Sequence, residues 1–373
     1  MKRITYMSRF SRPLSDEGLR LLGEKAAANN AEHGITGILI TIGETFFQII
    51  EGEDAAIDAL FTTISRDSRH TDIVRFSTEM AISERLFASW SMKTVNLDKE
   101  PGEIVAALRT LVRNLSLAHY IVERYTQPAV SAFLQGGRNP LDVLTKKCER
   151  VVVFMDIVGF SLMMALRPID EMCALVNDVL DRCAGAVSAY GGEVTKFLGD
   201  GLLAYWNAKE MDLALEGTVA SCEAVRRIRE EAPSGSVRKV THVGFGLSLG
   251  EVIEGNFGSK TKTDYTILGD SVNLAARIEK ISRKVGRPIC VTEAVTKRAS
   301  TKWQFEDLGV QPIPGIQDTV RVFALDHPAA KELIAKQDLI AFLQNPLAPT
   351  PGPSDLGKRP VKHRWLTARR ERV

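Results

Sequence analysis

Long apolar runs are missing from this chain of 373 residues. Its apolar stretches, such as Val151–Met155, end after a handful of residues, whereas a helix that spans a membrane needs about 20. The first residues, Met1-Lys2-Arg3, are positive, but the apolar core of a secretion signal does not follow them. We therefore expect a cytosolic protein without a membrane span.

Paired cysteines and clustered histidines are missing too. The five cysteines are odd in number, scattered and without a CxxC pair, which excludes a disulfide framework and a common redox motif. The six histidines show no zinc spacing. The cysteines are expected to be reduced and to act mostly as packing residues.

A strong excess of one charge is also absent, since the whole chain carries +2. Residues 351–373 alone carry +5, with seven Lys or Arg against Asp355 and Glu371, so the other 350 residues sum to −3. Such a tail can touch nucleic acid or anionic lipid, but a solvated, disordered end is the favoured interpretation. No specific nucleic-acid binding is expected.

The length and the average composition fit two or three soluble domains. Residues 1–98 alternate short strands and helices, 99–148 form a helical neck and hinge, 149–326 form a second globular unit, and 327–373 form a mostly disordered basic extension. In the first segment, strands are expected at Arg3–Ser8, Thr36–Ile42, Thr45–Glu51 and Ser91–Leu97, and helices at Ser15–Asn30 and around Ile57–Ile64.

The neck is predicted as a helix from Glu103 to about Tyr125. Its apolar residues recur at helical spacing, and they are Ile104, Leu108, Leu111 and Leu115. This pattern is typical either of a helix that caps a domain or of a dimeric coiled coil. The Gln127-Pro128 pair and the 135–140 cluster are expected to break it and to form a hinge.

A carboxylate follows the apolar strand of the second unit. Asp156 ends the strand, and Ile157, Gly159 and Phe160 lie in the turn behind it. A carboxylate binds a metal cation, and the backbone N–H groups of such a turn face an anion such as a phosphate. Because aspartate also caps helices, an ordinary structural role explains this pattern about equally well.

Two further stretches carry polar residues in apolar surroundings. Asp200 lies in the tight turn Gly199-Asp200-Gly201, and Lys196 precedes it inside an apolar strand, where a cation needs a partner. Asn273 and Arg277 lie four residues apart on one face of a helix that Asp270 is expected to cap. Taken singly, each residue also fits a turn, a cap or a solvated charge.

Together these stretches resemble the catalytic motifs of the class III nucleotidyl cyclases. The resemblance covers residues 149–325 and includes Asp156-Ile157, Leu198–Gly201, Gly244–Ser259 and Asp264–Arg277. It implies two Mg²⁺ ions per site, with Mn²⁺ as an alternative, held by Asp156, Ile157 and Asp200. It also implies adenine selection by Lys196 with Asp264 and Thr266, ribose orientation by Asn273 and transition-state stabilisation by Arg277.

Lysine is a donor only, so Lys196 suits the N1 acceptor of adenine and disfavours guanine. ATP is therefore the expected substrate, and a guanylyl cyclase is the nearest alternative. In this family each active site combines residues of two subunits, so a homodimer with composite sites is implied. One departure is Ile313-Pro314-Gly315, which stands where relatives commonly carry Leu-Lys-Gly for the triphosphate.

Gln48 in the first segment shares a strand face with Phe46 and Ile50, where a buried amide needs partners. The hydroxyl of Tyr6 and a bound polar ligand are candidates. From periodicity alone, a glutamine that faces water is the favoured explanation.

The sequence of residues 1–98, however, resembles that of the BLUF domains, which are blue-light sensors that bind FAD. The matching residues include Tyr6, Asn30, Thr36-Gly37, Phe47–Gly52, Arg69–Ile73 and Trp90–Met92. The resemblance implies that Gln48 bridges Tyr6 and the flavin and that its hydrogen bonds rearrange in light. It also implies that Asn30 and His70 contact the cofactor site, and that Trp90 and Met92 lie on the strand that relays the change.

The two halves together resemble the bacterial photoactivated adenylyl cyclases, whose linker Tyr125–Pro128 also matches. The resemblance implies an α+β protein with two ferredoxin-like α/β-sandwich domains joined by a helical neck. Its expected activity is conversion of ATP to 3′,5′-cyclic AMP and pyrophosphate, faster in blue light. A catalytically weak, light-controlled signalling scaffold is the alternative of a different class.

Overall fold

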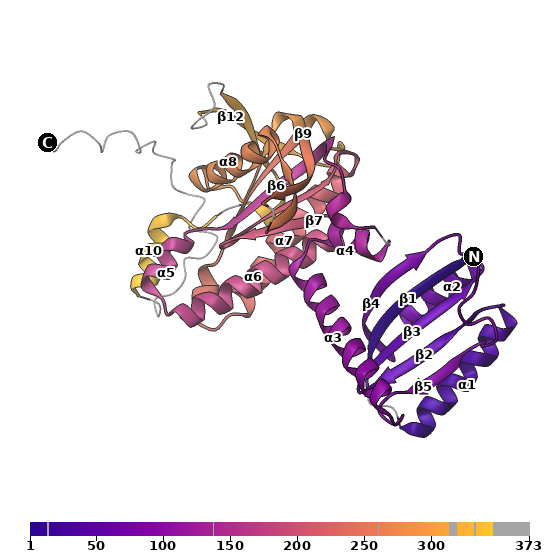
Figure 1. Ribbon diagram of the computed structural model, residues 1–373. Helices are drawn as coiled ribbons and strands as arrows, with labels where there is room; N and C mark the ends of the chain where they lie inside the picture. The colour runs from indigo at the N-terminus through magenta and orange to yellow at the C-terminus, as the bar shows by residue number, and fades with distance from the viewer. Residues whose placement is uncertain (13–14, 137, 260, 313–318, 332, 346–373) are drawn as a thin grey trace, which may run out of the picture. The chain divides into compact units, whose positions relative to one another are not determined.

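The computed structural model describes residues 1–12, 15–136, 138–259, 261–312, 319–331 and 333–345. The chain forms two compact units (Figure 1). The first unit comprises residues 1–146 and borrows residues 254–266 from later in the chain. The second unit comprises residues 147–253 and the chain from 267 onward.

A five-stranded sheet forms the centre of the first unit, with strand order β4-β1-β3-β2-β5. Its strands are β1 (Lys2–Phe10), β2 (Thr36–Ile42), β3 (Thr45–Gly52), β4 (His70–Glu79) and β5 (Lys93–Asn96). The sequence missed β4, and the strand expected from Ser91 begins two residues later. The other strands and both helices, α1 (Asp16–Glu32) and α2 (Asp54–Arg66), lie close to the expected bounds.

Strand periodicity separates the two faces of this sheet. Tyr6 lies opposite Gln48, which in turn lies opposite Leu39, so these three side chains share a face. That face packs against both α1 and α2. The opposite face carries Met7 and meets α3 (Glu103–Tyr125), the expected neck helix.

The neck continues into a second short helix, where the sequence predicted only a hinge. After the break at Gln127, α4 (Pro128–Gln135) and a 3-10 turn (Pro140–Asp142) follow. Phe133 of α4 packs edge-on against Tyr265 with ring centroids 5.4 Å apart. Asn256 donates from Nδ2 to the carbonyl of Pro140 at 2.7 Å. These contacts tie the neck to the borrowed segment 254–266.

An eight-stranded sheet has the order β12-β13-β11-β9-β6-β8-β7, with β10 paired to β9. Most of it belongs to the second unit, whereas the end of β9 and most of β10 belong to the first. Its strands are β6 (Lys146–Ile157), β7 (Glu193–Leu198), β8 (Gly201–Asn207), β9 (Val243–Gly258), β10 (Thr263–Leu268), β11 (Ile289–Thr292), β12 (Phe305–Gln311) and β13 (Val320–Leu325). The helices are α5 (Phe160–Leu166), α6 (Ile169–Ala189), α7 (Met211–Glu231), α8 (Asp270–Val285), α9 (Glu293–Arg298) and α10 (Lys336–Gln344). Short 3-10 turns occur at Ala208–Glu210, Val237–Val240 and Pro328–Ala330.

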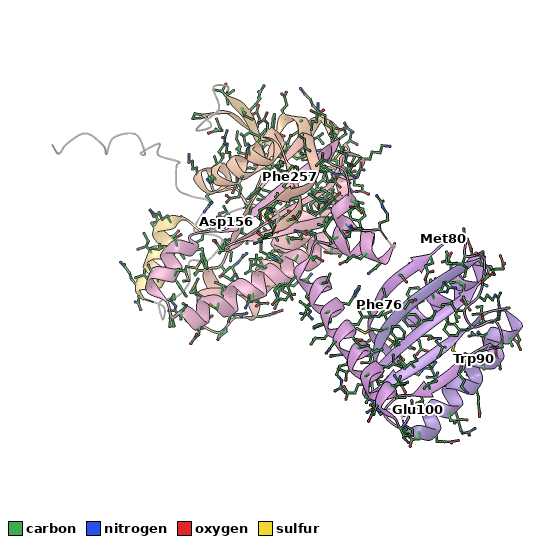
Figure 2. The ribbon with its side chains drawn as sticks, viewed as in Figure 1. Phe76, Met80, Trp90, Glu100, Asp156 and Phe257 are labelled. Carbon is green, nitrogen blue, oxygen red and sulfur yellow. The ribbon has the colours of Figure 1, made fainter. Side chains whose placement is uncertain are left out.

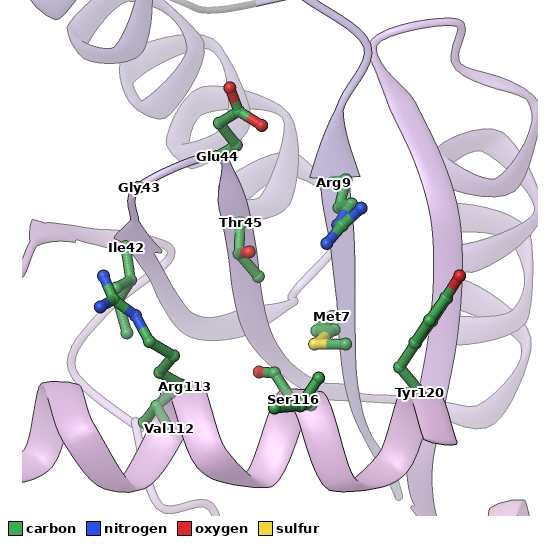
Figure 3. Close-up of a pocket in the computed structure, with 11 residues that line it drawn as sticks. Met7, Arg9, Ile42, Gly43, Glu44, Thr45, Val112, Arg113, Ser116 and Tyr120 are labelled. Carbon is green, nitrogen blue, oxygen red and sulfur yellow. The ribbon is translucent and has the colours of Figure 1, made fainter. Parts of the chain in front are cut away.

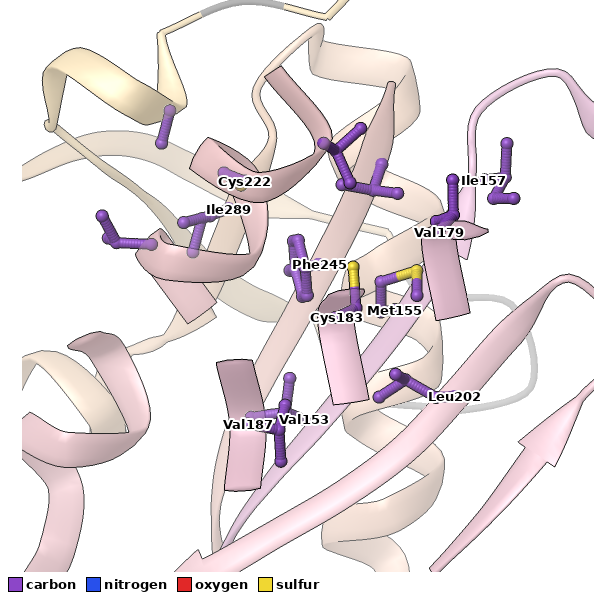
Figure 4. Close-up of a cluster of buried hydrophobic side chains, with 14 of the residues drawn as sticks. Val153, Met155, Ile157, Val179, Cys183, Val187, Leu202, Cys222, Phe245 and Ile289 are labelled. Atoms are coloured by element: carbon purple, nitrogen blue, oxygen red, sulfur yellow. The ribbon is translucent and has the colours of Figure 1, made fainter. Parts of the chain in front are cut away.

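The apolar strand β6 divides the core of this unit in two. Val153 and Met155 are fully buried against α6 and α7 (Figure 4), whereas Val152 lies in a separate cluster with Ala275 of α8. Because side chains alternate along a strand, Asp156 belongs to the face of Val152 and therefore points to the side of α8. The strand thus directs its terminal carboxylate toward that helix.

The globular part does not end near Asp326, as the sequence suggested, but includes α10. Leu339, Phe342 and Leu343 of this helix are buried in the main core of the second unit. A side chain added at Gly159 would collide with Leu339, so α10 packs directly on the turn after β6. The predicted tail from residue 346 lies outside the described residues. Among the described residues, no helix is both long and apolar enough to cross a membrane.

Truncating Phe342 tests the place of α10 in the core. We expect Phe342→Ala to lower the free energy of unfolding of the second unit by about 3–5 kcal/mol, because it empties a buried ring site. The exposed neighbour Gln344→Ala should change it by less than about 0.5 kcal/mol. Denaturant unfolding of both variants measures this, and equal stabilities would contradict the packing of α10.

Candidate functional sites

A buried tyrosine–glutamine pair lies at the centre of the first unit. Tyr6 is fully buried, and its hydroxyl donates to Oε1 of Gln48 on the neighbouring strand. Burial raises the pKa of Tyr6 far above its ordinary value, and the charge of Asp67 raises it further. The phenol therefore remains protonated and a donor across the physiological pH range.

A cavity of about 280 Å³ opens in front of this pair, between α1, α2 and the sheet. Three residues expected from the sequence line it: Asn30, Gln48 and His70. Burial lowers the pKa of His70, whose Nδ1 lies 2.6 Å from the hydroxyl oxygen of Ser8. The volume is near the lower end of small-molecule pockets.

The cavity also has lining residues that sequence reasoning missed, among them Lys25 and Asp67. Lys25 lies one helical turn before Asn29, which also lines the cavity, so spacing along α1 was the signal available for it. An exposed lysine at the mouth of a cavity suits the phosphates of a dinucleotide whose ring system lies deeper.

The segment before β5 closes one side of the same region. Asn30 donates from Nδ2 to the carbonyl of Ser91 at 2.9 Å, and Gln48 Nε2 lies 3.7 Å from the sulfur of Met92. Trp90 does not line the cavity: it is 41% exposed and stacks on Phe87. Trp90 and Met92 therefore both precede the strand on which the sequence placed them.

A buried carboxylate anchors this segment, and its role was not foreseen. Glu51 is fully buried and accepts from Phe87 N at 2.6 Å, Leu86 N at 3.1 Å and Arg3 Nε at 3.0 Å. Burial alone would raise the pKa of Glu51, but these hydrogen bonds and the charge of Arg3 outweigh it and lower the pKa.

A second cavity, of about 330 Å³, lies on the opposite face of the sheet under α3 (Figure 3). Met7 and Thr45 of the sheet face Ser116 and Tyr120 of the helix across it. The neck helix is therefore incompletely packed on the five-stranded sheet. An interface with such a cavity lacks the dense contacts that would hold α3 in a single position.

In the second unit, two carboxylates meet where β6 ends (Figure 2 labels Asp156). Asp200, in the turn between β7 and β8, brings its carboxyl group within hydrogen-bonding reach of Asp156. A Cβ atom at Gly201 would collide with the carbonyl oxygen of Met155 and would lie 3.1 Å from Oδ1 of Asp156, so glycine there permits the approach. Burial raises the pKa of Asp200, and the adjacent Asp156 raises it further.

Two residues of α8 complete this cluster, and sequence reasoning missed both. Nη2 of Arg283 lies 2.9 Å from Oδ2 of Asp156 and 2.8 Å from Oε2 of Glu279. Glu279 is buried, which raises its pKa to about 7, with Arg283 acting in the opposite direction. Their i,i+4 spacing was visible in the sequence, but it is typical of an exposed helical pair.

The other expected residues of this site are distributed around the pair. Ile157 is fully buried, so only its backbone can contact a ligand, and Gly159 has the left-handed φ of 72° that the turn requires. The ring of Phe160 packs on the core, which leaves its backbone N–H at the turn. Gly269, and not Asp270, is the N-cap residue of α8.

Lys196 lies on β7 beside an irregularity in its pairing with β8. Asn273 and Arg277 lie on α8, and neither side chain has an ion pair or hydrogen bond in the part of the chain that the structure describes. In the first unit, Asp264 and Thr266 lie on β10. Thr266 is buried, and its hydroxyl has no partner among the described residues. Residues 313–315, where the sequence departs from the family motif, lie outside the described part.

Comparison with known proteins assigns both units. A family model described as sensors of blue light using FAD matches residues 1–93, and one described as the adenylate and guanylate cyclase catalytic domain matches residues 144–327. A solved bacterial light-regulated adenylyl cyclase is 33% identical, with a TM-score of 0.86, over 93% of this chain and 99% of that one. The chain belongs to the photoactivated adenylyl cyclase family.

Curated members of the photoactivated adenylyl cyclase family match as well. The beta subunits from Euglena gracilis and Euglena longa are 30% and 31% identical over 314 residues, which is 83% of this chain. The chain spans about a third of the length of these relatives, 36% in both. The family relationship also bears out the expected two α+β domains, a flavin-binding sensor and a cyclase.

The residues at both sites fit the cofactors of the family. BLUF sensors bind FAD, and the amide N–H of Gln48, held in the described residues only by the weak acceptor Met92, leaves donor capacity for a ligand. Cyclase domains use divalent metal ions, and the close pair Asp156 and Asp200 is a suitable donor set. No group of three or more acidic, His or Cys ligands occurs among the described residues, so substrate phosphates would complete the shell.

Acidification tests the anchoring role of Glu51. Because its pKa is lowered in the folded protein, its contribution is present at neutral pH and is lost as the pH falls through that lowered value. We expect the hydrogen-exchange protection of the Leu86 and Phe87 amides to decrease below about pH 4.3, the ordinary glutamate pKa. Glu51→Gln should reduce protection about 10- to 100-fold at neutral pH. The exposed Glu53→Gln is the control, and equal protection in both variants would refute the anchor.

Proposed function

We propose that this chain is a blue-light-activated adenylyl cyclase that converts ATP to 3′,5′-cyclic AMP and pyrophosphate. The observation that carries the proposal is the close carboxylate pair Asp156 and Asp200 in a chain whose other unit buries Tyr6 against Gln48 at a ligand cavity. The first arrangement suits metal-assisted phosphoryl chemistry, and the second suits a flavin photosensor. The names of the relatives describe the same combination.

The cyclase reaction is attack of the ribose 3′-oxygen on the α-phosphorus, with pyrophosphate leaving. Asp156 and Asp200, with the backbone of Ile157, would hold two Mg²⁺ or Mn²⁺ ions. Metal ions at such a site lower the pKa of the attacking hydroxyl and offset the triphosphate charge. The backbone at Gly159 and Phe160 faces the phosphates, and α10 holds that turn in place through Leu339.

Three residues would read the adenine base. Lys196 donates to N1, an acceptor in adenine and a donor in guanine, and Asp264 or Thr266 accepts from the exocyclic amine. The buried Thr266 hydroxyl without a described partner supports a ligand at that position, because buried hydroxyls are normally hydrogen-bonded. Lys196 makes a guanylyl cyclase the weaker alternative.

We also propose a homodimer in which each active site uses both subunits. The neck residues Ile104, Leu108, Leu111 and Leu115 are 46–78% exposed and follow the 4-3-4 spacing of a coiled-coil seam. Phe197 and Leu198, next to the Asp200 turn, are 54% and 43% exposed. Apolar side chains at these places gain most from a second copy. Asn273 and Arg277 of the partner would then complete the site.

Light would act through Gln48. A bound FAD would supply the absorption of blue light, and Tyr6 would give up an electron and a proton to it. Tyr6 would then no longer donate to Gln48, and the Gln48 amide would rearrange against Met92. The adjoining segment is held to the sheet by Glu51, so a change at Gln48 reaches Trp90 and β5.

A route to the cyclase runs inside the first unit itself. Phe76 of β4 packs on His119 of α3 at 4.7 Å between ring centroids, and Phe133 of α4 packs on Tyr265. Tyr265 neighbours Thr266 on β10, and its hydroxyl donates to buried Glu254 at 2.8 Å. The five-stranded sheet and residues 263–266 of β10 thus belong to the same compact unit. A coupling of 1–3 kcal/mol gives about 5- to 150-fold activation.

The reaction would take place in the cytosol, where cysteines stay reduced, and all five cysteines are free thiols. The basic residues 358–372 lie outside the described part, and we assign them no nucleic-acid role.

Purified protein that makes no cyclic AMP with ATP and metal, in light or darkness, would overturn the enzyme proposal in favour of a light-controlled scaffold.

Replacing the Tyr6 hydroxyl separates sensing from chemistry. We expect Tyr6→Phe to retain dark turnover and to lose light stimulation, because the donor to Gln48 is gone. The light-induced red shift of the flavin spectrum should vanish with it. Cyclic AMP formation and visible absorption under blue light check both, and a stimulated Tyr6→Phe variant would refute the role of the pair.

Mixing two inactive variants tests the composite site. Asp200→Ala should form no product while its flavin spectrum still shifts in light, and Arg277→Ala should lose about 10²- to 10³-fold in rate. Random exchange of subunits puts both lesions in one site of each heterodimer, so the mixture should recover about a quarter of parental turnover. Failure to recover activity, although subunits exchange, would argue against sites shared between two subunits.

A further inference from the structure

One arginine bridges the metal-site carboxylate and a buried glutamate. Nη2 of Arg283 lies within 3 Å of oxygens of both Asp156 and Glu279. Arg283 is about one-third exposed and Glu279 is 3% exposed, so the arginine approaches the buried acid from the open side. No sequence motif pointed to these two residues.

Two carboxylates of this cluster share one guanidinium, that of Arg283. Asp156 lies beside Asp200 on one side and shares Arg283 with Glu279 on the other, and Arg283 is the cation in contact with both Asp156 and Glu279 among the described residues. The second oxygen of Glu279, Oε1, is buried without a hydrogen-bond partner in the described part of the chain. A guanidinium that contacts two carboxylates can keep its ion pair with one of them when the other binds a different cation.

We propose that Arg283 is the resident counter-cation of the metal site: it occupies Asp156 in the metal-free protein and competes with the divalent ion for that carboxylate. Glu279 retains the guanidinium when Asp156 is given to the metal. This inference deepens the proposed function, since it depends on Asp156 as a metal ligand. Arg283 is a positioning residue, and it does not touch substrate.

The alternative role for Arg283 is to orient Asp156, and it predicts the opposite change in metal affinity. If Arg283 only oriented Asp156 for coordination, its removal would weaken metal binding. If it competes with the metal, its removal frees the carboxylate and removes a like charge beside a divalent ion, so binding tightens. The same removal leaves the acids without their counter-charge, so the metal-free protein loses stability.

The experiment is direct metal binding to the nucleotide-free, full-length protein, with free Mn²⁺ measured by electron paramagnetic resonance. We expect Arg283→Met to lower the Kd for Mn²⁺ about tenfold and to lower the melting temperature in EDTA. Mn²⁺ should raise that temperature more in this variant than in the parent. Arg283→Lys keeps the charge and should bind Mn²⁺ nearly as the parent does.

Two further variants control for folding and for charge. Arg226 forms an i,i+4 pair with Glu230 at 2.7 Å on α7, away from the acids, so Arg226→Met should leave the Kd unchanged. Arg283→Met with Glu279→Gln removes one charge of each sign and avoids an unpaired buried glutamate. This double variant should still bind Mn²⁺ more tightly than the parent, and it decides the question if the single variant does not fold.

The outcomes separate this inference from the metal site itself. Asp156→Asn should abolish Mn²⁺ binding in the parental background. If it does, and removal of Arg283 leaves the Kd unchanged or higher, competition is refuted while the metal site stands. If Asp156→Asn binds like the parent, the metal assignment fails and the inference fails with it.

Discussion

Repulsion between two carboxylates that meet at the end of the buried strand β6 is the constraint around which the second unit is organised. Asp156 cannot withdraw, because the valines of β6 before it are locked in the core. Asp200 is brought against it by a tight turn whose Gly201 leaves no room for a side chain. Two carboxylates held this close repel each other when both are ionised, so the pair is more stable with a cation bound between them than without one.

The sensor unit follows a similar principle with neutral groups. Gln48 is buried between Tyr6, a donor that stays protonated, and Met92, whose sulfur is a weak acceptor. Its hydrogen-bonding capacity is therefore only partly used by the protein, and the remainder faces a cavity. In both units the fold buries polar groups that the protein itself pairs only in part, and a bound ligand would supply the remaining hydrogen bonds or charge.

Much of this arrangement was accessible from the sequence, and the exceptions have physical reasons. The strand before Asp156, the Asp200 turn and the neck helix have strong local signals, namely an apolar run, a Gly-Asp-Gly turn and a regular helical spacing. Strand β4 lacks clear alternation and is defined by its pairing with β1. Helix α10 is short and mixes charged and apolar residues, and its place is revealed by its burial in the core and its packing on the Gly159 turn. The link between Arg283 and Asp156 joins residues 127 positions apart, which no local pattern encodes.

The first unit is not a continuous stretch of chain, since it takes residues 254–266 from the middle of the cyclase sequence. A recombination event, natural or in the laboratory, that exchanges residues 1–146 as a cassette would pair a foreign α4 with the native Tyr265 and Asn256. We expect such a graft to keep these contacts only when residues 254–266 are transferred together with the neck. In related proteins we therefore expect the sensor and the cyclase sequences to change together, with matched substitutions at contacting positions more than a hundred residues apart.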